Sequence, residues 1–139
     1  MKPALRGILT ALLLCIATSL SAVDLVVNAD VPVDSLTRSM TRSIFSMRMT
    51  SWPNGMPIKV FVMGDKTPLH AAFSKQILGV FPHQLRRAWN RQIFAGTGQA
   101  PTKVDSEQEM IEQVADTPGA IGYVSEDVLN AQIRKIPVE

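Results

Sequence analysis

The sequence is poor in the residues on which catalytic and metal sites depend. Its 139 residues include one cysteine, Cys15, and two histidines, His70 and His83, which have no metal-ligand spacing between them. No HExxH, GxSxG, CxxC or phosphate-loop pattern occurs. Because Cys15 lies in the N-terminal apolar run, no disulfide or thiol chemistry is available to the rest of the chain. We therefore expect no enzyme, no metal and no cofactor, and we expect both histidines at the surface.

The N-terminus has the pattern of a secretory signal peptide. Lys2 and Arg6 precede an apolar run over residues 8–17, and small residues follow at Ser21 and Ala22. The run is shorter than the roughly 20 apolar residues that cross a bilayer, so no stable membrane insertion is expected after cleavage. We expect cleavage after Ser21 or Ala22, which divides the chain into a signal peptide at 1–22 and one domain at 23–139. This places the protein in the periplasm or outside the cell, in a bacterial envelope.

Charge is balanced overall but divided along the chain. Removal of Lys2 and Arg6 with the signal peptide leaves 12 basic against 12 acidic residues. From residue 38 to residue 91, nine basic residues face one acidic residue, Asp65, whereas most acidic residues follow residue 104. This basic half either suits an anionic ligand or surface, or consists of solvated helix faces that are neutralised across the fold.

Strand and helix patterns alternate along the domain. Short apolar runs rich in β-branched residues predict strands at 24–29, 58–63, 119–124 and 133–138. Apolar residues with helical spacing, together with capping and stop residues, predict helices at 35–45, 68–78, 82–95 and 106–114, and a short helix after Ser125. Strands separated by helices predict an α/β domain with a mostly parallel or mixed sheet flanked by helices.

Two stretches carry more specific expectations. In residues 117–124 (TPGAIGYV), Gly119 belongs to a turn, and Gly122 marks a position where other atoms approach the strand closely. In the helix at 82–95, Trp89 lies on an apolar stripe with Leu85, Ala88 and Ile93, so Trp89 is expected in the core. The arginines of that helix do not indicate a nucleic-acid partner, because the protein is expected to be exported.

The best candidate for an anion site is the junction at residues 64–70 (GDKTPLH). A helix that begins after Thr67 would offer unpaired backbone N–H groups and a partial positive charge, which favour an oxyanion. Thr67 would add a hydroxyl and Lys66 a full charge. Thr67 is also an ordinary N-cap residue, and Pro68 removes one donor from the first turn.

An ordered set of segments resembles the phosphate-type periplasmic substrate-binding proteins, and in particular their short, single-lobe relatives. The segments are VVN at 26–28, SLTRS at 35–39, IF at 44–45, WPNG at 52–55, the junction at 65–73, WNRQIFAG at 89–96 and GAIGYV at 119–124. The resemblance implies one half of a type II periplasmic-binding-protein fold. In full-length members, two lobes close over a phosphate that is held by a helix N-terminus and an arginine.

The junction departs from the family's pattern at two points. The resemblance places ligand contacts at Asp65, Lys66, Thr67 and Leu69, but Pro68 and Leu69 replace the Gly-Thr pair, and Met63 stands where the arginine is expected. Two functions are therefore kept open. One is an exported solute-binding protein for phosphate or a related oxyanion, in transport or sensing. The other is a non-catalytic accessory module that docks on an envelope protein or on itself.

Overall fold

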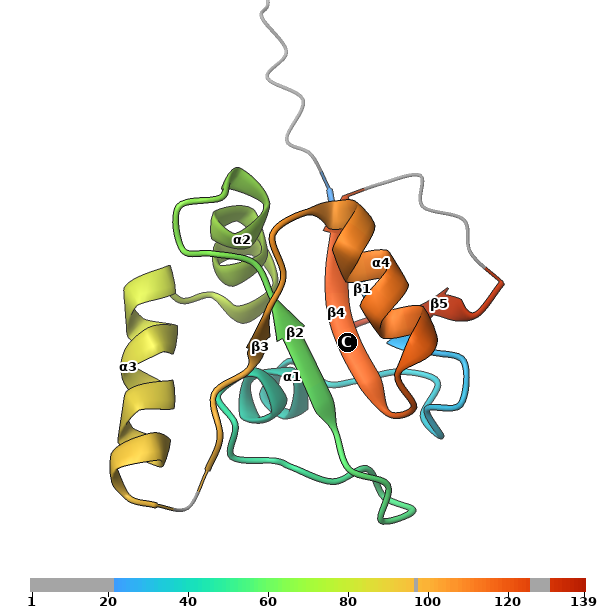
Figure 1. Cartoon of the computed structure of the whole chain (residues 1–139), viewed down its shortest axis with the longest axis horizontal. Coiled ribbons are helices and arrows are strands. Elements are labelled where there is room, and N and C mark those ends of the chain that lie inside the picture. The colour runs from blue at the N-terminus through green and yellow to red at the C-terminus, as the bar shows by residue number, and fades with distance from the viewer. Residues whose placement is uncertain (1–21, 97, 126–130) are drawn as a thin grey trace, which may run out of the picture.

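A five-stranded sheet with the order β3-β2-β4-β1-β5 organises the domain. Figure 1 shows the computed structural model, in which residues 22–96, 98–125 and 131–139 are described. The strands are β1 (Val23–Asn28), β2 (Lys59–Val62), β3 (Thr102–Lys103), β4 (Ala120–Ser125) and β5 (Ile133–Lys135). The expected signal peptide and the expected helix after Ser125 lie outside the described residues.

The sheet is mixed because β1 is antiparallel to the other four strands. β2 pairs in parallel with both β3 and β4, while β1 pairs antiparallel with β4 and β5. The pairing of Val26 with Gly122 joins the first strand of the domain to the glycine-containing stretch near its end. The expected α/β class with a mixed sheet is confirmed.

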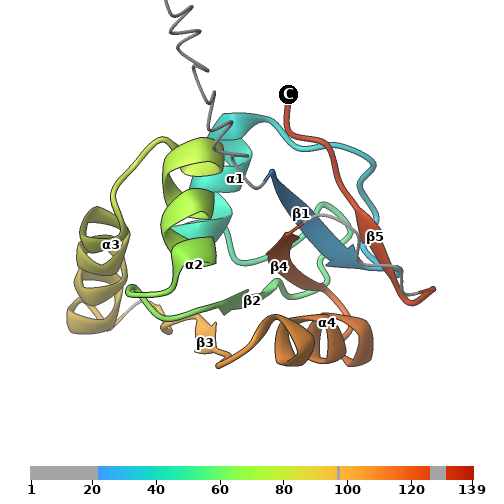
Figure 2. The same ribbon diagram turned by 90° about the horizontal axis from the view of Figure 1, so that it is seen from above.

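Helices cover both faces of the sheet. Helix α4 (Glu107–Asp116) lies on one face, and α1 (Arg38–Phe45) and α2 (Pro68–Phe73) lie on the other (Figure 2). Helix α3 (Pro82–Phe94) stands beyond α2, next to the β2 and β3 edge. Among the described residues, no helix is both long and apolar enough to cross a membrane.

The helices differ from expectation in three respects. Helix α1 begins after Thr37 rather than at Ser35, because Leu36 instead forms a bridge to Val138. After α2 the chain continues as a π-helical segment, η1 (Ser74–Leu78), which ends at Gly79 as predicted. On α3, Trp89 is buried as predicted, together with Leu85, but the apolar stripe is not buried along its whole length, since Ile93 is 44% exposed.

Aromatic rings from three elements fill the core between the sheet and the helices on the α2 side. Tyr123 of β4 stacks on Phe73 of α2 with ring centroids 4.0 Å apart, and Phe45 of α1 tilts against Phe73 at 4.6 Å. All three side chains are completely buried. This packing holds the C-terminal end of α2 against β4, and the candidate site lies at the opposite end of the same helix.

Candidate anion-binding site

A cavity of about 570 Å³ opens where β2 and β3 end. The two strands are parallel, so their carboxyl ends meet at one edge of the sheet, a common position for ligand sites in α/β folds. The segment that follows β2 forms one wall, and α3 and the segment that follows β3 form the others. The polar and charged side chains that line the cavity are Asp65, Lys66, Thr67, Arg86, Lys103 and Asp105.

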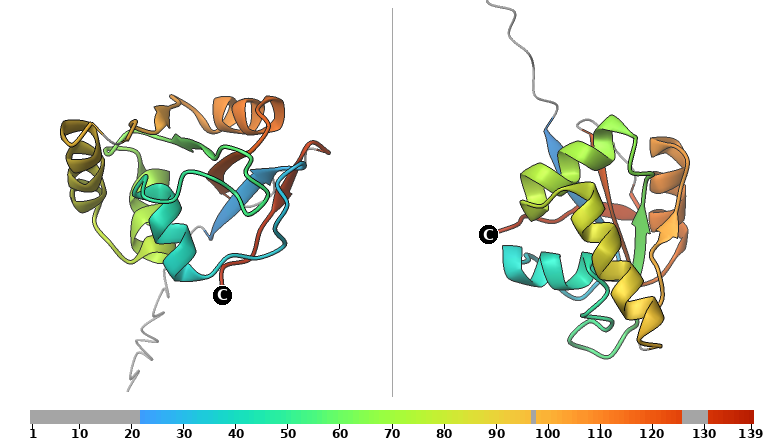
Figure 3. Two further views of the ribbon diagram at one scale, coloured as in Figure 1. Left: turned by 90° about the horizontal axis from the view of Figure 1, so that it is seen from below. Right: turned by 90° about the vertical axis from the view of Figure 1, so that its left-hand side faces the viewer.

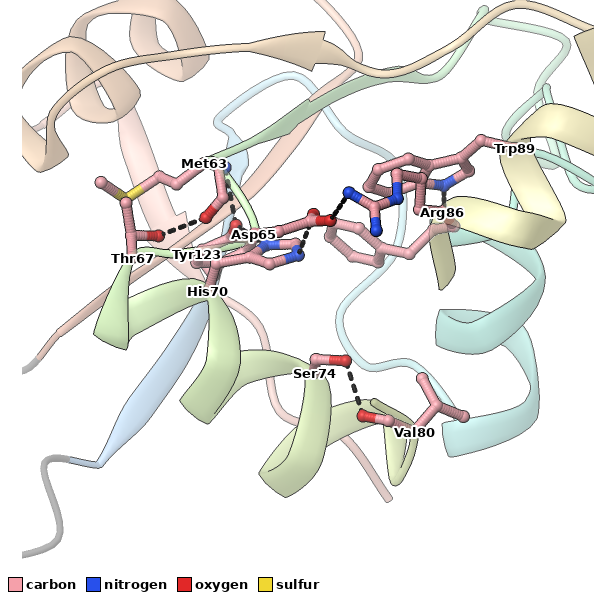
Figure 4. Close-up of polar contacts among 11 residues, drawn as sticks. Met63, Asp65, Thr67, His70, Ser74, Val80, Arg86, Trp89 and Tyr123 are labelled. Carbon is pink, nitrogen blue, oxygen red and sulfur yellow. Dashed lines mark hydrogen bonds and ion pairs between the residues drawn. The ribbon is translucent and has the colours of Figure 1, made fainter. Parts of the chain in front are cut away.

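Arg86 of α3 supplies a guanidinium to this cavity. Its Nη1 lies 2.6 Å from Oδ2 of Asp65, which makes a charge-assisted contact between α3 and the loop before α2 (Figure 4). The Arg86 side chain is 57% exposed and the Asp65 side chain 24% exposed. The pair therefore stands at the cavity wall, with guanidinium N–H groups still open to a ligand or water.

The start of α2 leaves its first-turn amides uncapped. Thr67 occupies the predicted N-cap position, but its hydroxyl donates to the carbonyl oxygen of Gly64 at 2.7 Å and does not accept from the first turn. The helical bonds begin with the Ala71 N–H, which donates to Thr67 O. The N–H groups of Leu69 and His70 precede that bond and have no carbonyl one turn back within the helix. The Leu69 side chain packs against the core, so only its backbone can serve a ligand.

A buried polar chain connects Asp65 to the centre of the sheet. The hydroxyl of Tyr123 accepts from the Met63 N–H at 2.7 Å and lies 2.5 Å from Nδ1 of His70 (Figure 4). The Tyr123 hydroxyl accepts from Met63 and can donate to Nδ1, which satisfies the hydroxyl and Nδ1 and places the histidine proton on Nε2. This nitrogen is buried, has no hydrogen-bond partner among the described residues, and faces Oδ1 of Asp65 at 3.7 Å.

His70 is completely buried, so its prediction as a surface residue is wrong. The sequence gives no sign of this, because the partner hydroxyl comes from a strand 53 residues away. Burial lowers the pKa of His70, and the nearby Asp65 carboxylate offsets part of that effect. Burial also raises the pKa of Tyr123, so its hydroxyl stays protonated and can donate.

The lowered pKa of His70 predicts that acid destabilises the fold. At pH values below 6.5, the ordinary pKa of histidine, this side chain binds a proton in the unfolded chain more readily than in the native state. The free energy of unfolding should therefore fall from pH 6.5 towards pH 5, by at most about 1.4 kcal/mol per pH unit. Urea titrations across this range measure the slope. His70→Gln should reduce it, whereas His83→Gln, at an exposed position, should not. An unchanged slope in His70→Gln would contradict the assignment.

The structure brings three of the four expected ligand residues to one cavity and adds two cations. Asp65, Lys66 and Thr67 line it together, whereas the side chain of Leu69 does not. Arg86 and Lys103 were missed because they come from a different helix and strand. The sequence contains one signal for a basic partner of Asp65. Asp65 is the only acidic residue between positions 38 and 91, a region with nine basic residues that include Arg86.

A single α/β lobe with a cationic cavity at the ends of its parallel strands has the architecture of one half of a two-lobed binding protein. The chain belongs to the PBP superfamily domain family, whose model matches residues 16–136. No curated protein matches it.

Solved structures show the same fold. An ABC-type phosphate transport receptor from Vibrio cholerae aligns with a TM-score of 0.64 at 19% identity, and PstS from Borrelia burgdorferi with 0.65 at 15%. A Clostridium perfringens protein solved with bound phosphate aligns with 0.67 at 21% identity. Each alignment covers 84% of this chain but only 45%, 47% and 44% of the respective neighbour. The chain thus spans less than half the length of these proteins.

Proposed function

We propose that the protein is an exported, solute-binding-like protein of the periplasm whose cavity beside Asp65 binds phosphate or a related oxyanion, for transport or sensing. The observation that carries this proposal is the convergence of Lys66, Arg86 and Lys103 on the cavity at the start of α2. Three cations against two carboxylates leave a positive balance there, and the uncapped amides of the first turn add to it. The matched structures, which include phosphate receptors, support the same ligand class.

Arg86 can stand in for the guanidinium that is missing at Met63. It approaches from α3 rather than from β2, and Asp65 holds it at 2.6 Å. A guanidinium anchored in this way presents a planar fork to an oxyanion, which a lysine cannot do. The loss of arginine at position 63 therefore does not remove this chemistry from the cavity.

Asp65 gives the cavity a basis for selectivity. An ionised carboxylate only accepts hydrogen bonds, so it favours an oxyanion that carries a proton. Phosphate near neutral pH retains such a proton, whereas sulfate has none. The cavity should therefore prefer phosphate to sulfate, although the two ions have similar size and charge.

A titration of the purified protein tests the proposal. Phosphate should raise the melting temperature in the concentration-dependent way that mass action requires, and sulfate at equal ionic strength should raise it less. Arg86→Gln should weaken phosphate binding roughly tenfold or more, because it removes a charged hydrogen-bond donor and leaves Asp65 unopposed. Arg87→Gln is the matched control, since Arg87 is exposed on the same helix and does not line the cavity.

A second function is favoured by the exposure of the cavity wall. The Arg86 side chain is 57% exposed, so its guanidinium is open to a protein partner as well as to a small anion. A lobe of this kind could instead serve as a non-catalytic module that docks on an envelope protein or on a second copy. Absence of any phosphate effect, together with a crosslinked complex in envelope extracts, would favour this function over solute binding.

A further inference from the structure

A second hollow lies between the C-terminal end of α1 and the middle of α3. It consists of two adjoining cavities of about 250 and 260 Å³ that share Ser46, Arg48, Ala88 and Arg91. Helices α1 and α3 approach each other here (Figure 3), and the Trp89 indole N–H donates to Phe45 O at 2.6 Å, which ties them together. We call this hollow the arginine groove. None of its lining residues lines the cavity beside Asp65.

Three arginines line the arginine groove, and two of them are anchored by their inner nitrogen. Nε of Arg42 donates to Leu78 O at 2.6 Å, and Nε of Arg48 donates to the Ser46 hydroxyl at 3.2 Å. The terminal N–H groups of both side chains are therefore left for another acceptor. Arg91 adds a third guanidinium from α3, on the turn that follows Trp89.

No carboxylate balances these charges within the described part of the chain. Neither cavity of the arginine groove has an aspartate or glutamate in its lining, and none of the three arginines belongs to an ion pair there. The one acidic residue between positions 38 and 91, Asp65, is paired with Arg86. Like charges around one hollow repel each other, and an anion in the hollow would remove that repulsion.

The dimensions and the donors of the groove indicate which anion it suits. Guanidinium forks match the geometry of phosphate oxygens. The two cavities adjoin at Arg48 and Arg91, so a pair of linked phosphate groups with one group in each cavity would have these two arginines between them. We propose that the arginine groove is a second anion site, which binds a diphosphate or a similarly multivalent phosphate group. Such a group is present in free diphosphate and in the headgroups of phosphorylated lipids.

Calorimetric titration of the whole protein with inorganic diphosphate tests the site, and the double substitution Arg48→Gln with Arg91→Gln removes it. Both side chains are exposed, and Arg42 is left in place because it supports Leu78 O. The double variant should bind diphosphate at least about a hundredfold more weakly. The matched control is Arg38→Gln with Arg87→Gln, which removes the same charge from exposed positions on α1 and α3 that do not line the groove. The experiment is repeated in an Arg86→Gln background, so that binding beside Asp65 is measured separately.

Vesicles distinguish the two sources of phosphate. Phosphatidylcholine vesicles that contain diacylglycerol diphosphate carry two linked phosphate groups at a membrane surface, and vesicles with phosphatidylglycerol at equal surface charge provide the comparison. Arginine-dependent binding of free diphosphate alone supports a soluble ligand, and arginine-dependent binding of the diacylglycerol diphosphate vesicles supports a lipid headgroup. Binding to neither overturns the proposal. Equal loss in the control variant also overturns it, because the effect would then follow from net charge alone.

Discussion

Replacement of Gly119 by alanine should cost about 3–5 kcal/mol of the free energy of unfolding, which is a large part of the total for a domain of this size. A Cβ at this position would lie 2.3 Å from the backbone oxygen of Pro57 and 3.2 Å from the Met56 side chain. Gly119 also has a φ of +77°, where alanine is strained. The carbonyl oxygen of Gly119 accepts from the Trp52 indole at 3.0 Å and from the Lys59 N–H at 3.1 Å, so a shift of this turn disturbs the start of β2 as well.

Gly55→Ala is the matched control for this prediction. Gly55 has a similar φ of +87°, but an added Cβ would meet no atom within 4 Å. It should therefore cost only the backbone strain, about 1 kcal/mol. Urea unfolding followed by tryptophan fluorescence compares the two variants, since Trp52 is buried against Gly119. Equal stabilities would show that the contact with Pro57 does not constrain the turn.

The roles of Gly119 and Gly122 could be predicted from the sequence, because each role depends on the residues next to the glycine in the chain. The turn at Gly119 follows from the Pro-Gly pair, and Gly122 interrupts an apolar strand. In the structure, a Cβ at Gly122 would lie 2.5 Å from Sδ of Met110, so α4 packs directly on the backbone of β4. Most helices and strands could be predicted for the same reason, since the periodicity and the capping residues of each element lie within its own segment of the sequence.

The order and direction of the strands in the sheet could not be predicted from local sequence patterns. The pairing of Val26 with Gly122 joins residues that are distant in sequence, and nothing in β1 indicates that it runs antiparallel to β4. The buried state of His70 has the same origin. A histidine in the first turns of a helix is usually solvated, and only the hydroxyl of Tyr123 makes burial acceptable.

The residues of the candidate site fall into the same two groups, those predictable from local sequence and those placed by long-range packing. Asp65, Lys66 and Thr67 were predictable because they form one continuous junction between a strand and a helix. Arg86 and Lys103 reach the cavity through the packing of α3 and through the parallel pairing of β3 with β2. Long-range packing thus supplied the guanidinium whose absence from position 63 had counted against a phosphate site.

Tyr123 connects the core to this site, because one hydroxyl holds both the end of β2 and the first turns of α2. Met63, whose N–H donates to that hydroxyl, lies two residues before Asp65, and His70 lies five residues after it. The loop that carries Asp65, Lys66 and Thr67 is therefore fixed on both sides by a residue of β4. A site with this support should be rigid before any ligand binds.

Tyr123→Phe should lower the free energy of unfolding by about 2–5 kcal/mol although the ring is retained. The substitution leaves the Met63 N–H and Nδ1 of His70 buried without partners, and each such group costs roughly 1–3 kcal/mol. Ser74→Ala is the comparison, since it also deletes a completely buried hydroxyl but leaves only Val80 O unpaired, and carbonyl oxygens tolerate this better. Urea titration of both variants measures the difference, and His70→Gln with Tyr123→Phe completes a double-mutant cycle. The two substitutions should couple by more than about 0.5 kcal/mol, whereas additive effects would show that the short contact between the ring nitrogen and the hydroxyl is not a stabilising hydrogen bond.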